Sequence, residues 1–268
     1  MPQDHSDTLI DALLQISLDA GAEIMRIYEG EIDIRTKDDA SPVTDADEAA
    51  EKIILAGLAI AAPHIPVVAE ESAAAGVIPD ISGGIFFLVD PLDGTKEFIS
   101  KNGEFTVNIA LIENGQPISG VVYAPAIGTI YAGTAEGAFM QKQDANGQWG
   151  DRQPIAVRPA PAEGLTVVAS RSHRSPETDE FIAQYDVANI RSAGSSLKLC
   201  LLAAAEADLY PRLGRTMEWD IGAGHAVLRA AGGNITLMDG TPFTYGKAPI
   251  FENPYFIAAG FDNSGNIR

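Results

Sequence analysis

Two stretches near the beginning of the chain place apolar side chains at helical spacing. In residues 6–28 the apolar positions recur every three or four residues, and Ser6 is a suitable N-cap. Residues 45–62 repeat the pattern, with Thr44 as N-cap and Asp47 three positions later, which is the spacing of a capping box. The sequence therefore predicts two amphipathic helices in its first quarter.

Farther along, the pattern becomes that of β-strands. Residues 65–69 form a short strand, and the continuous apolar run at 85–89 is typical of a buried one. Two hairpins follow, with an Asn-Gly turn at 114–115 and a Glu-Gly turn at 136–137. Their strands are expected at 106–112, 118–123, 129–134 and 138–142. This part of the chain is predicted to form an antiparallel sheet with helices to one side.

Residues 143–164 lack periodicity and are rich in Gly, Pro, Asp and Gln, so a domain boundary is placed there. Beyond it, strand-like and helix-like stretches alternate at 165–169, 176–185, 187–191, 195–206, 219–231, 234–238 and 255–259. The predicted fold class is mixed, α+β or α/β. An N-terminal α+β domain with the antiparallel sheet (1–150) precedes a smaller C-terminal α/β domain (151–268).

The composition of the 268-residue chain is that of a globular protein with a large core, since 46% of its residues are hydrophobic and 21% are charged. The net charge of −19 argues against nucleic acid or an anionic membrane surface as a partner. One cysteine, Cys200, excludes an internal disulfide and fits a reducing compartment. The N-terminus lacks the basic region of a signal peptide, and the longest apolar run, 53–62, is too short to span a bilayer. We therefore expect a soluble cytoplasmic protein without a transmembrane segment.

Candidate chemistry begins with the segment DPLDGT at residues 90–95, which directly follows the buried strand. Its two acids, three positions apart, can aim their carboxylates at one point, because Pro91 fixes the chain and Gly94 allows close approach. Hard cations such as Mg²⁺ favour oxygen ligands of this kind. The backbone N–H groups around Gly94 and Thr95 can receive a phosphate. An ordinary Asx-type turn explains the hexapeptide equally well.

Two further acidic positions strengthen the interpretation as a cation site. Glu70 and Glu71 follow the short strand with little apolar cover, and Asp220 lies near the start of the helix expected at 219–231. Each position also has an ordinary explanation. The glutamates fit a polar loop, and Asp220 fits a cap or a first-turn acid.

Together these segments resemble the inositol monophosphatase-like superfamily of Mg²⁺-dependent, lithium-sensitive phosphatases. The resemblance covers nearly the whole chain and rests on Lys37, residues 41–47 (SPVTDAD), 70–72 (EES), 90–95 (DPLDGT), Trp219-Asp220 and Ala223-Gly224. It implies a layered αβαβα sandwich, the sugar phosphatase fold. Within the superfamily the chain is most similar to 3′(2′),5′-bisphosphate nucleotidases of the CysQ type, through residues 96–98, 102–108, 170–173, 194–198 and 210–212.

The resemblance implies a centre of two or three Mg²⁺ ions between the two domains. Glu70, Asp90 and the backbone carbonyl of Leu92 match the ligands of the first ion. Asp90 is shared with the second ion, whose other ligands match Asp93 and Asp220. These carboxylates would repel one another strongly without metal. Mg²⁺ would remove that repulsion and lower the pKa of a bound water.

The catalytic residues that the resemblance implies are Asp47, Glu70 and Thr95. Thr95 and Asp47 match the pair that orients the nucleophilic water in this family. The capping box remains a second explanation for Asp47, and both roles are compatible. In-line attack on phosphorus depends on positioning and charge neutralisation more than on a protein nucleophile. Cys200 is therefore assigned to core packing.

Substrate contacts are implied at Leu92, Asp93, Gly94, Thr95, His173, Ser195, Lys198, Arg212 and Asp220. Four of them, His173, Ser195, Lys198 and Arg212, match positions that contact the nucleotide in bisphosphate nucleotidases. Ser195 also stands at an expected helix start, and an arginine can hold a phosphate bidentately. A capping serine, solvated basic residues and a loop histidine are the alternatives. His225 is interpreted as structural.

Two departures from the family pattern bear on the substrate. Inositol-specific members carry a carboxylate seven positions before the aspartate that corresponds to Asp220, and this chain has Leu213 there, beside Arg212. The basic side chain of Arg212 is better suited to binding a second phosphate than to binding an uncharged inositol ring. Arg215-Thr216 replaces the Pro-Thr of many nucleotidases, with no consequence that the sequence reveals.

The resemblance thus implies Mg²⁺-dependent removal of the 3′-phosphate from adenosine 3′,5′-bisphosphate, with the sulfated nucleotide as a second substrate. An inositol or sugar monophosphatase is the alternative with the same metal chemistry. A non-catalytic acidic protein that binds divalent cations is a third alternative, although such a protein is expected to have lost at least one of the site residues. The sequence leaves monomer and homodimer open, and peripheral association with the inner membrane is implied by the resemblance alone.

Overall fold

The computed structural model describes residues 3–30, 32–36, 42–169 and 175–260. Within these ranges the helices are α1 (Gln3–Tyr28), α2 (Asp45–Ala61), α3 (Glu70–Ala74), α4 (Thr95–Ile99), α5 (Pro176–Ile182), α6 (Leu197–Ala203) and α7 (Glu218–Ala230), with a 3₁₀ turn at Pro125–Ile127. None of these helices combines the length and the apolar character that a bilayer span requires.

The strands form two large sheets and one small one. A seven-stranded sheet has the order β3-β4-β5-β6-β7-β8-β9 and is antiparallel apart from its β3–β4 pair. Its strands are β3 (Val67–Ala69), β4 (Ile85–Asp93), β5 (Thr106–Glu113), β6 (Gln116–Ala124), β7 (Thr129–Thr134), β8 (Gly137–Lys142) and β9 (Gln153–Ile155). A five-stranded sheet comprises, in spatial order, β11 (Val187–Ser192), β10 (Leu165–Ala169), β12 (Leu209–Arg212), β14 (Phe256–Ala259) and β13 (Asn234–Leu237). The small sheet pairs β1 (Ile34–Thr36) with β2 (Pro42–Thr44).

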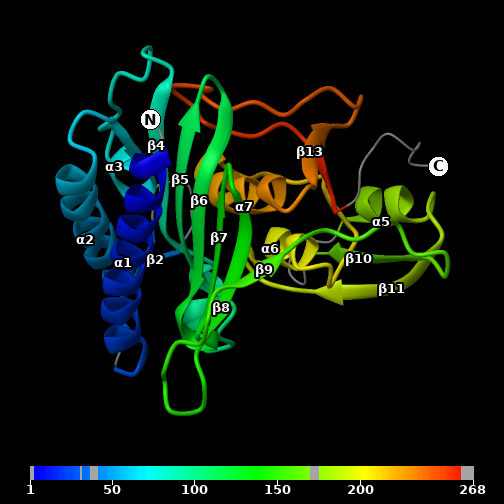
Figure 1. Ribbon diagram of the computed structural model, residues 1–268, viewed down its shortest axis with the longest axis horizontal. Coiled ribbons are helices and arrows are strands. Elements are labelled where there is room, and N and C mark those ends of the chain that lie inside the picture. Colours follow the sequence, from blue (N-terminus) through cyan, green and yellow to red (C-terminus); the bar gives the residue numbers. More distant parts are fainter. Residues whose placement is uncertain (1–2, 31, 37–41, 170–174, 261–268) are drawn as a thin grey trace.

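The two large sheets and the helices form alternating layers (Figure 1). Helices α1 and α2 pack on one face of the seven-stranded sheet, and α7 packs on the other face against β5, β6 and β7. Helix α6 lies beside α7 and contacts β12, and these two helices share a core with Val168 and Tyr210 of the second sheet. On the outer face of that sheet, Ile182 of α5 packs with Val167 and Leu209. The αβαβα sandwich expected from the family resemblance is confirmed.

Local sequence signals account for the elements nearest to the site. Asp47 accepts a hydrogen bond from the Thr44 backbone N–H at 2.8 Å, and Thr44 caps the first turn, so the predicted capping box begins α2. Asn114 and Gly115 have positive φ angles of 50° and 75°, as a tight hairpin requires, and they join β5 to β6. The predicted second helix and first hairpin are therefore confirmed.

Glycines let α7 lie very close to the large sheet. A Cβ atom at Gly120 would lie 2.8 Å from the Cβ of Ala226, and one at Gly133 would lie 2.7 Å from the Ala226 carbonyl oxygen. These spacings are shorter than van der Waals contact, so a larger residue at either position would force the helix away. Because α7 also contacts β4, this packing holds its first turn, which carries Asp220, near the end of that strand.

Some elements differ from the sequence-based expectation. The apolar pattern does not predict the short elements α3, α4, β9 and β12. The helix expected at 195–206 spans only seven residues, because Ser195 and Ala205 have left-handed φ angles of 44° and 57° that a helix cannot include. Strand β9 lies within the stretch expected to be the domain boundary and pairs with β8. The division of the chain at residue 150 stays a prediction.

Candidate active site

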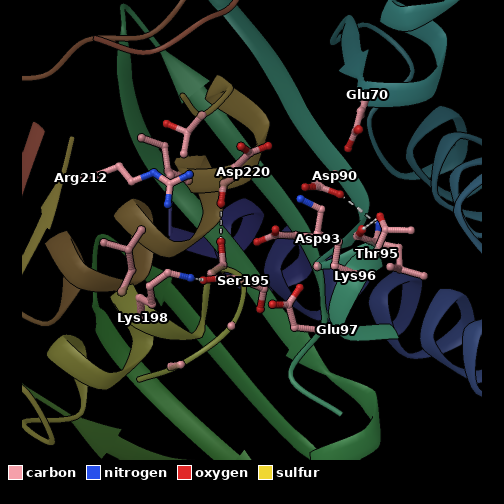
Figure 2. A pocket seen from close by; sticks show the side chains of 18 of the residues that line it. Glu70, Asp90, Asp93, Thr95, Lys96, Glu97, Ser195, Lys198, Arg212 and Asp220 are labelled. Carbon is pink, nitrogen blue, oxygen red and sulfur yellow. Dashed lines mark hydrogen bonds between the residues drawn. The ribbon is translucent and has the colours of Figure 1, made fainter. Parts of the chain in front are cut away.

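A pocket of about 250 Å³ lies where the end of β4 meets the starts of α4, α6 and α7. In Figure 2, Arg212 and Lys198 lie on one side of it and Glu70 and Asp90 on the other, with Asp93 and Asp220 between them. The remaining lining includes Leu92, Gly94, Thr95, Lys96, Glu97, Ser195 and Arg215. The pocket therefore gathers all the described metal-ligand and substrate-contact candidates.

The two aspartates of the DPLDGT segment share a face of the sheet because β4 contains a bulge. Asp90 pairs with Asn108, and Asp93 pairs with Thr106, so three steps on β4 match two steps on β5. On a regular strand, residues three apart point to opposite faces. The extra residue, next to Pro91, reverses this and directs both carboxylates to the pocket.

The turn after Asp90 supports the same arrangement. The Leu92 backbone N–H donates to the Asp90 carboxylate at 3.1 Å, which is the Asx-type turn that the sequence left open as an alternative. Gly94 follows with a φ of 92°, and a Cβ there would lie 3.2 Å from the Glu104 carbonyl oxygen. The turn and the candidate cation site are therefore compatible, and Gly94 lets α4 begin at once with Thr95.

Thr95 and Asp47 meet across the edge of the pocket. The Thr95 hydroxyl lies 3.3 Å from Asp47 Oδ1 and 3.4 Å from the Leu92 carbonyl oxygen. The other Asp47 oxygen accepts hydrogen bonds from the Thr44 N–H and hydroxyl, at 2.8 and 2.7 Å. Asp47 thus caps α2 and contacts Thr95 at the same time, so the capping box is confirmed, and the role in orienting a water is compatible with it and stays a prediction.

Glu70 enters the pocket from a third segment. It directly follows the parallel strand β3 and is the first residue of α3, so the polar loop considered for this stretch is a short helix instead. The helix begins there because a carboxylate from another element, Glu51, accepts hydrogen bonds from its first turn. Sequence reasoning missed Glu51, since its partners lie 20 or more positions away.

Asp220 comes from the first turn of α7. Its carboxylate accepts a hydrogen bond from the Met217 N–H at 2.8 Å, so the first-turn role expected for this acid is confirmed. Its backbone carbonyl accepts a hydrogen bond from the Ser196 hydroxyl, which ties α7 to the segment before α6. Capping leaves one carboxylate oxygen of Asp220 available to the pocket, since only Oδ2 receives the Met217 bond.

The basic side of the pocket comes from the second sheet and α6. Lys198 is buried and donates to the Ser195 carbonyl at 2.7 Å. Arg212, at the end of β12, donates from Nη2 to the Arg215 carbonyl at 2.7 Å. The Ser195 hydroxyl and Arg212 Nε are buried and have no hydrogen-bond partner among the described residues. Two pocket residues therefore keep polar atoms that a bound anion can satisfy.

Burial and mutual repulsion perturb the acids of the pocket. Loss of water, followed by the charges of Asp93 and Glu70, raises the pKa of Asp220 well above its ordinary value. Loss of water also raises the pKa of Asp93, although nearby Lys198 opposes the shift. Burial lowers the pKa of Lys198 to about 8, and Asp93 partly offsets that effect. The pocket is therefore short of positive charge beside its carboxylates.

Two titratable residues outside the pocket behave as structural groups. His225 lies 2.9 Å from the Tyr245 hydroxyl and 3.1 Å from Asn234 Oδ1, and its ring is buried. Cys200 is buried in the core between the two sheets, and burial raises the pKa of its thiol. Both agree with their expected structural roles. The candidate His173 lies outside the described residues.

The acidic donor set fits a hard divalent cation. The four carboxylates expected to bind metal, those of Glu70, Asp90, Asp93 and Asp220, border one pocket with Leu92, and their repulsion is of the kind that a cation relieves. Within the described part of the chain, no three Asp, Glu, His or Cys side chains already converge into a tight metal cluster. Mg²⁺ commonly uses few carboxylates and completes its shell with waters and substrate phosphate, which suits this spacing.

Comparison with known proteins places the chain in a family. The model of the inositol monophosphatase family matches residues 5–260. The chain belongs to this family. One family relative, the 3′(2′),5′-bisphosphate nucleotidase CysQ of Escherichia coli strain K12, is 44% identical over 250 residues, which cover 92% of this chain and 98% of the relative. The protein of that name from Buchnera aphidicola is 40% identical over 255 residues, covering 94% and 92%.

Solved structures of the inositol monophosphatase family have the same fold. CysQ from Bacteroides thetaiotaomicron superposes with a TM-score of 0.78 at 36% identity and covers 96% of this chain and 98% of its own. An IMPase from Thermotoga maritima superposes with a TM-score of 0.76 at 25% identity, covering 94% and 91%. The resemblance inferred from the sequence motifs is confirmed.

Proposed function

We propose that the chain is a Mg²⁺-dependent phosphatase that removes the 3′-phosphate from adenosine 3′,5′-bisphosphate and releases AMP and phosphate. The observation that carries the proposal is the 44% identity to Escherichia coli bisphosphate nucleotidase CysQ over almost its whole length. The pocket supports it, because Arg212 and Lys198 lie on one side of a single space and Glu70 and Asp90 on the other. A nucleoside bisphosphate carries one phosphate that can bind at the acidic, metal-binding side and a second that can bind at the basic side. The sulfated nucleotide likewise has two such anionic groups.

The metal side of the pocket would hold two or three Mg²⁺ ions through Glu70, Asp90, Asp93, Asp220 and the Leu92 carbonyl. When bound, Mg²⁺ neutralises the charge of the phosphate under attack and lowers the pKa of water. The chain fixes these ligands on separate elements: the bulge of β4, the first turn of α3 and the first turn of α7. Glu70 also belongs to the proposed catalytic set.

Thr95 and Asp47 orient the attacking water in this proposal. When the Thr95 hydroxyl donates to Asp47 Oδ1, its lone pairs point elsewhere and can accept a hydrogen bond from water. The water oxygen then bonds to phosphorus and the bond from phosphorus to the 3′-oxygen breaks. One proton of the water goes, in balance, to the 3′-oxygen, and the other leaves with the released phosphate. Such positioning, together with charge neutralisation, supplies most of the catalysis in phosphoryl transfer.

The basic side of the pocket holds the phosphate that is not cleaved. Arg212 Nε and the Ser195 hydroxyl are donors without a partner in the described part of the chain, and Lys198 adds a buried positive charge. The backbone of Gly94 and Thr95 is placed to receive the reacting phosphate at the start of α4. His173 remains a candidate nucleotide contact by resemblance.

An inositol or sugar monophosphatase is the second candidate, since solved inositol monophosphatases have the same fold. Leu213, in place of a carboxylate, disfavours it because a leucine cannot bind sugar hydroxyls. A non-catalytic cation-binding protein is disfavoured because all four acidic metal-ligand candidates line one pocket. We further propose a cytoplasmic location, which the single buried cysteine supports.

The test is a phosphate-release assay on adenosine 3′,5′-bisphosphate, inositol 1-phosphate and fructose 1,6-bisphosphate, each with and without Mg²⁺. We expect the nucleotide to be hydrolysed with the highest kcat/KM, only with Mg²⁺, and to give 5′-AMP. Preference for either sugar phosphate would support the second candidate. Release of phosphate from none of them would support a non-catalytic protein.

A further inference from the structure

Glu51 is a buried carboxylate that lies beside the pocket without lining it. Its side chain is on α2 and only 6% exposed. One oxygen accepts the Glu71 N–H at 2.8 Å. The other accepts the Ser72 N–H at 2.9 Å and the Ser72 hydroxyl at 2.6 Å. A single carboxylate therefore binds three donors at the start of α3.

Helix α3 depends on this carboxylate for its first turn. It has only five residues, and its N-cap Ala69 offers no side-chain acceptor. A helix this short is unstable by itself, because too few internal hydrogen bonds offset the cost of starting it. Two of its free N–H groups are satisfied by Glu51 instead. The orientation of its first residue, Glu70, therefore depends on Glu51.

We propose that Glu51 is a positioning residue that sets the Glu70 carboxylate for metal binding, an inference that rests on the proposed function. Asp47 and Glu51 are four positions apart, so they lie on the same face of α2. Asp47 contacts Thr95 at the start of α4, and Glu51 holds the start of α3. One rigid helix thus fixes a candidate metal ligand and the candidate water-orienting hydroxyl relative to each other.

Only a carboxylate at position 51 can accept all three hydrogen bonds from Glu71 and Ser72. An ionised carboxylate has about four acceptor positions and no donor, so both oxygens can serve. In Glu51→Gln one oxygen becomes an NH₂ group, which would face an N–H donor of α3 and cannot bind it. In Glu51→Ala all three donors lose their partner. Either change frees the first turn of α3, which carries Glu70, although no pocket-lining residue is itself substituted.

The test is isothermal titration of Mg²⁺ into the full-length protein without substrate, paired with the Mg²⁺ dependence of nucleotide hydrolysis. We expect Glu51→Ala and Glu51→Gln to weaken Mg²⁺ binding by roughly 10- to 100-fold, as is usual when a group that orients a metal ligand is lost. The Mg²⁺ concentration for half-maximal rate should rise in parallel. The KM for the nucleotide at saturating Mg²⁺ should change less than about threefold, because its contacts are intact.

Two control variants separate positioning from general destabilisation. Ser72→Ala removes one of the three bonds and keeps both backbone bonds, so its effect on Mg²⁺ binding should be the smallest of the series. Glu48→Gln removes a carboxylate of the same helix that pairs with exposed Arg35, and it should leave Mg²⁺ binding unchanged. Thermal unfolding of each variant shows which samples are folded.

The outcomes distinguish the inference from the proposed function. Mg²⁺ binding by folded Glu51→Gln that equals the wild type, even with a lower Tm, would overturn the positioning role. If Glu51→Ala fails to fold, Glu51→Gln alone decides by the same criterion. A wild-type protein that binds no Mg²⁺ would instead refute the metal chemistry of the proposed function and the inference with it.

Discussion

The Thr95 hydroxyl lies 3.3 Å from Asp47 Oδ1, although 48 positions separate the two residues. Asp47 is in the first turn of α2, and Thr95 is the first residue of α4. The contact holds the turn after β4 against α2, and both α2 and α4 contribute side chains to the same core cluster. It also leaves the Thr95 oxygen at the pocket, where water and phosphate would meet.

This contact leads to the first prediction. Thr95→Val keeps the shape of the side chain but removes the hydroxyl, so the attacking water loses its hydrogen-bond acceptor. We expect kcat for adenosine 3′,5′-bisphosphate to fall by roughly 10²- to 10⁴-fold with little change in KM. Thr95→Ser keeps the hydroxyl and should retain most of the rate. Steady-state kinetics of both variants measure the effect, and equal losses in the two would contradict a role for the hydroxyl.

Arg212 should select substrates with two phosphates. Its Nε has no hydrogen-bond partner among the residues that the structure describes, and a charge-assisted contact to the uncleaved phosphate is worth about 1.5–3 kcal/mol. Arg212→Ala should therefore lower kcat/KM for adenosine 3′,5′-bisphosphate by roughly 10- to 150-fold. Slow hydrolysis of a simple monophosphate should remain nearly unchanged, because the carboxylates are intact.

The matched control for Arg212 is Arg191→Ala, which removes an exposed arginine that pairs with Glu206 outside the pocket. Arg191→Ala should leave kcat/KM unchanged for both the bisphosphate and the monophosphate. Equal losses on both substrates in Arg212→Ala would assign Arg212 to the fold or the metal side, and no loss on either would make it a surface residue.

His225 should make stability depend on pH. Burial lowers its pKa in the folded protein from 6.5 to about 4, so between those values the unfolded chain binds a proton that the folded protein does not. The contribution of His225 to the free energy of unfolding is then greatest above pH 6.5 and is lost as the pH drops toward 4. The contribution is on the order of 3 kcal/mol for a shift of this size.

Chemical denaturation of the wild type and His225→Gln between pH 4 and 7.5 measures this effect. The variant cannot gain the proton, so its stability should fall less steeply over that interval, whatever its stability at pH 7. Parallel curves for the two proteins would show that His225 keeps an ordinary pKa.

The elements that the sequence predicts well are those specified by neighbouring residues. Thr44 and Asp47 cap α2 within four positions, and Asn114-Gly115 turns the first hairpin by its own backbone preference. The DPLDGT motif located the acidic site because its turn is also local.

The remaining features depend on contacts between distant segments. Helix α3 begins at Glu70 only because Glu51 lies next to it in the folded chain, and no local pattern reports that contact. Strand β12 is defined by pairing with β14, from the C-terminal end of the described chain. Ser195 was expected at a helix start, and its left-handed φ instead places it before α6. Such relationships require the fold itself.

The most direct test of the metal-dependent phosphatase is the Asp90→Asn variant. Asp90 is buried, borders the pocket, and is the one side chain proposed to serve both principal metal ions, while the substitution removes charge at constant volume. The measurement is kcat/KM for adenosine 3′,5′-bisphosphate with saturating Mg²⁺, for variant and wild type of matched thermal stability. We expect a loss of at least about a thousandfold, or ~4 kcal/mol in the barrier. Activity within about tenfold of the wild type, or ~1.4 kcal/mol, would contradict the assignment.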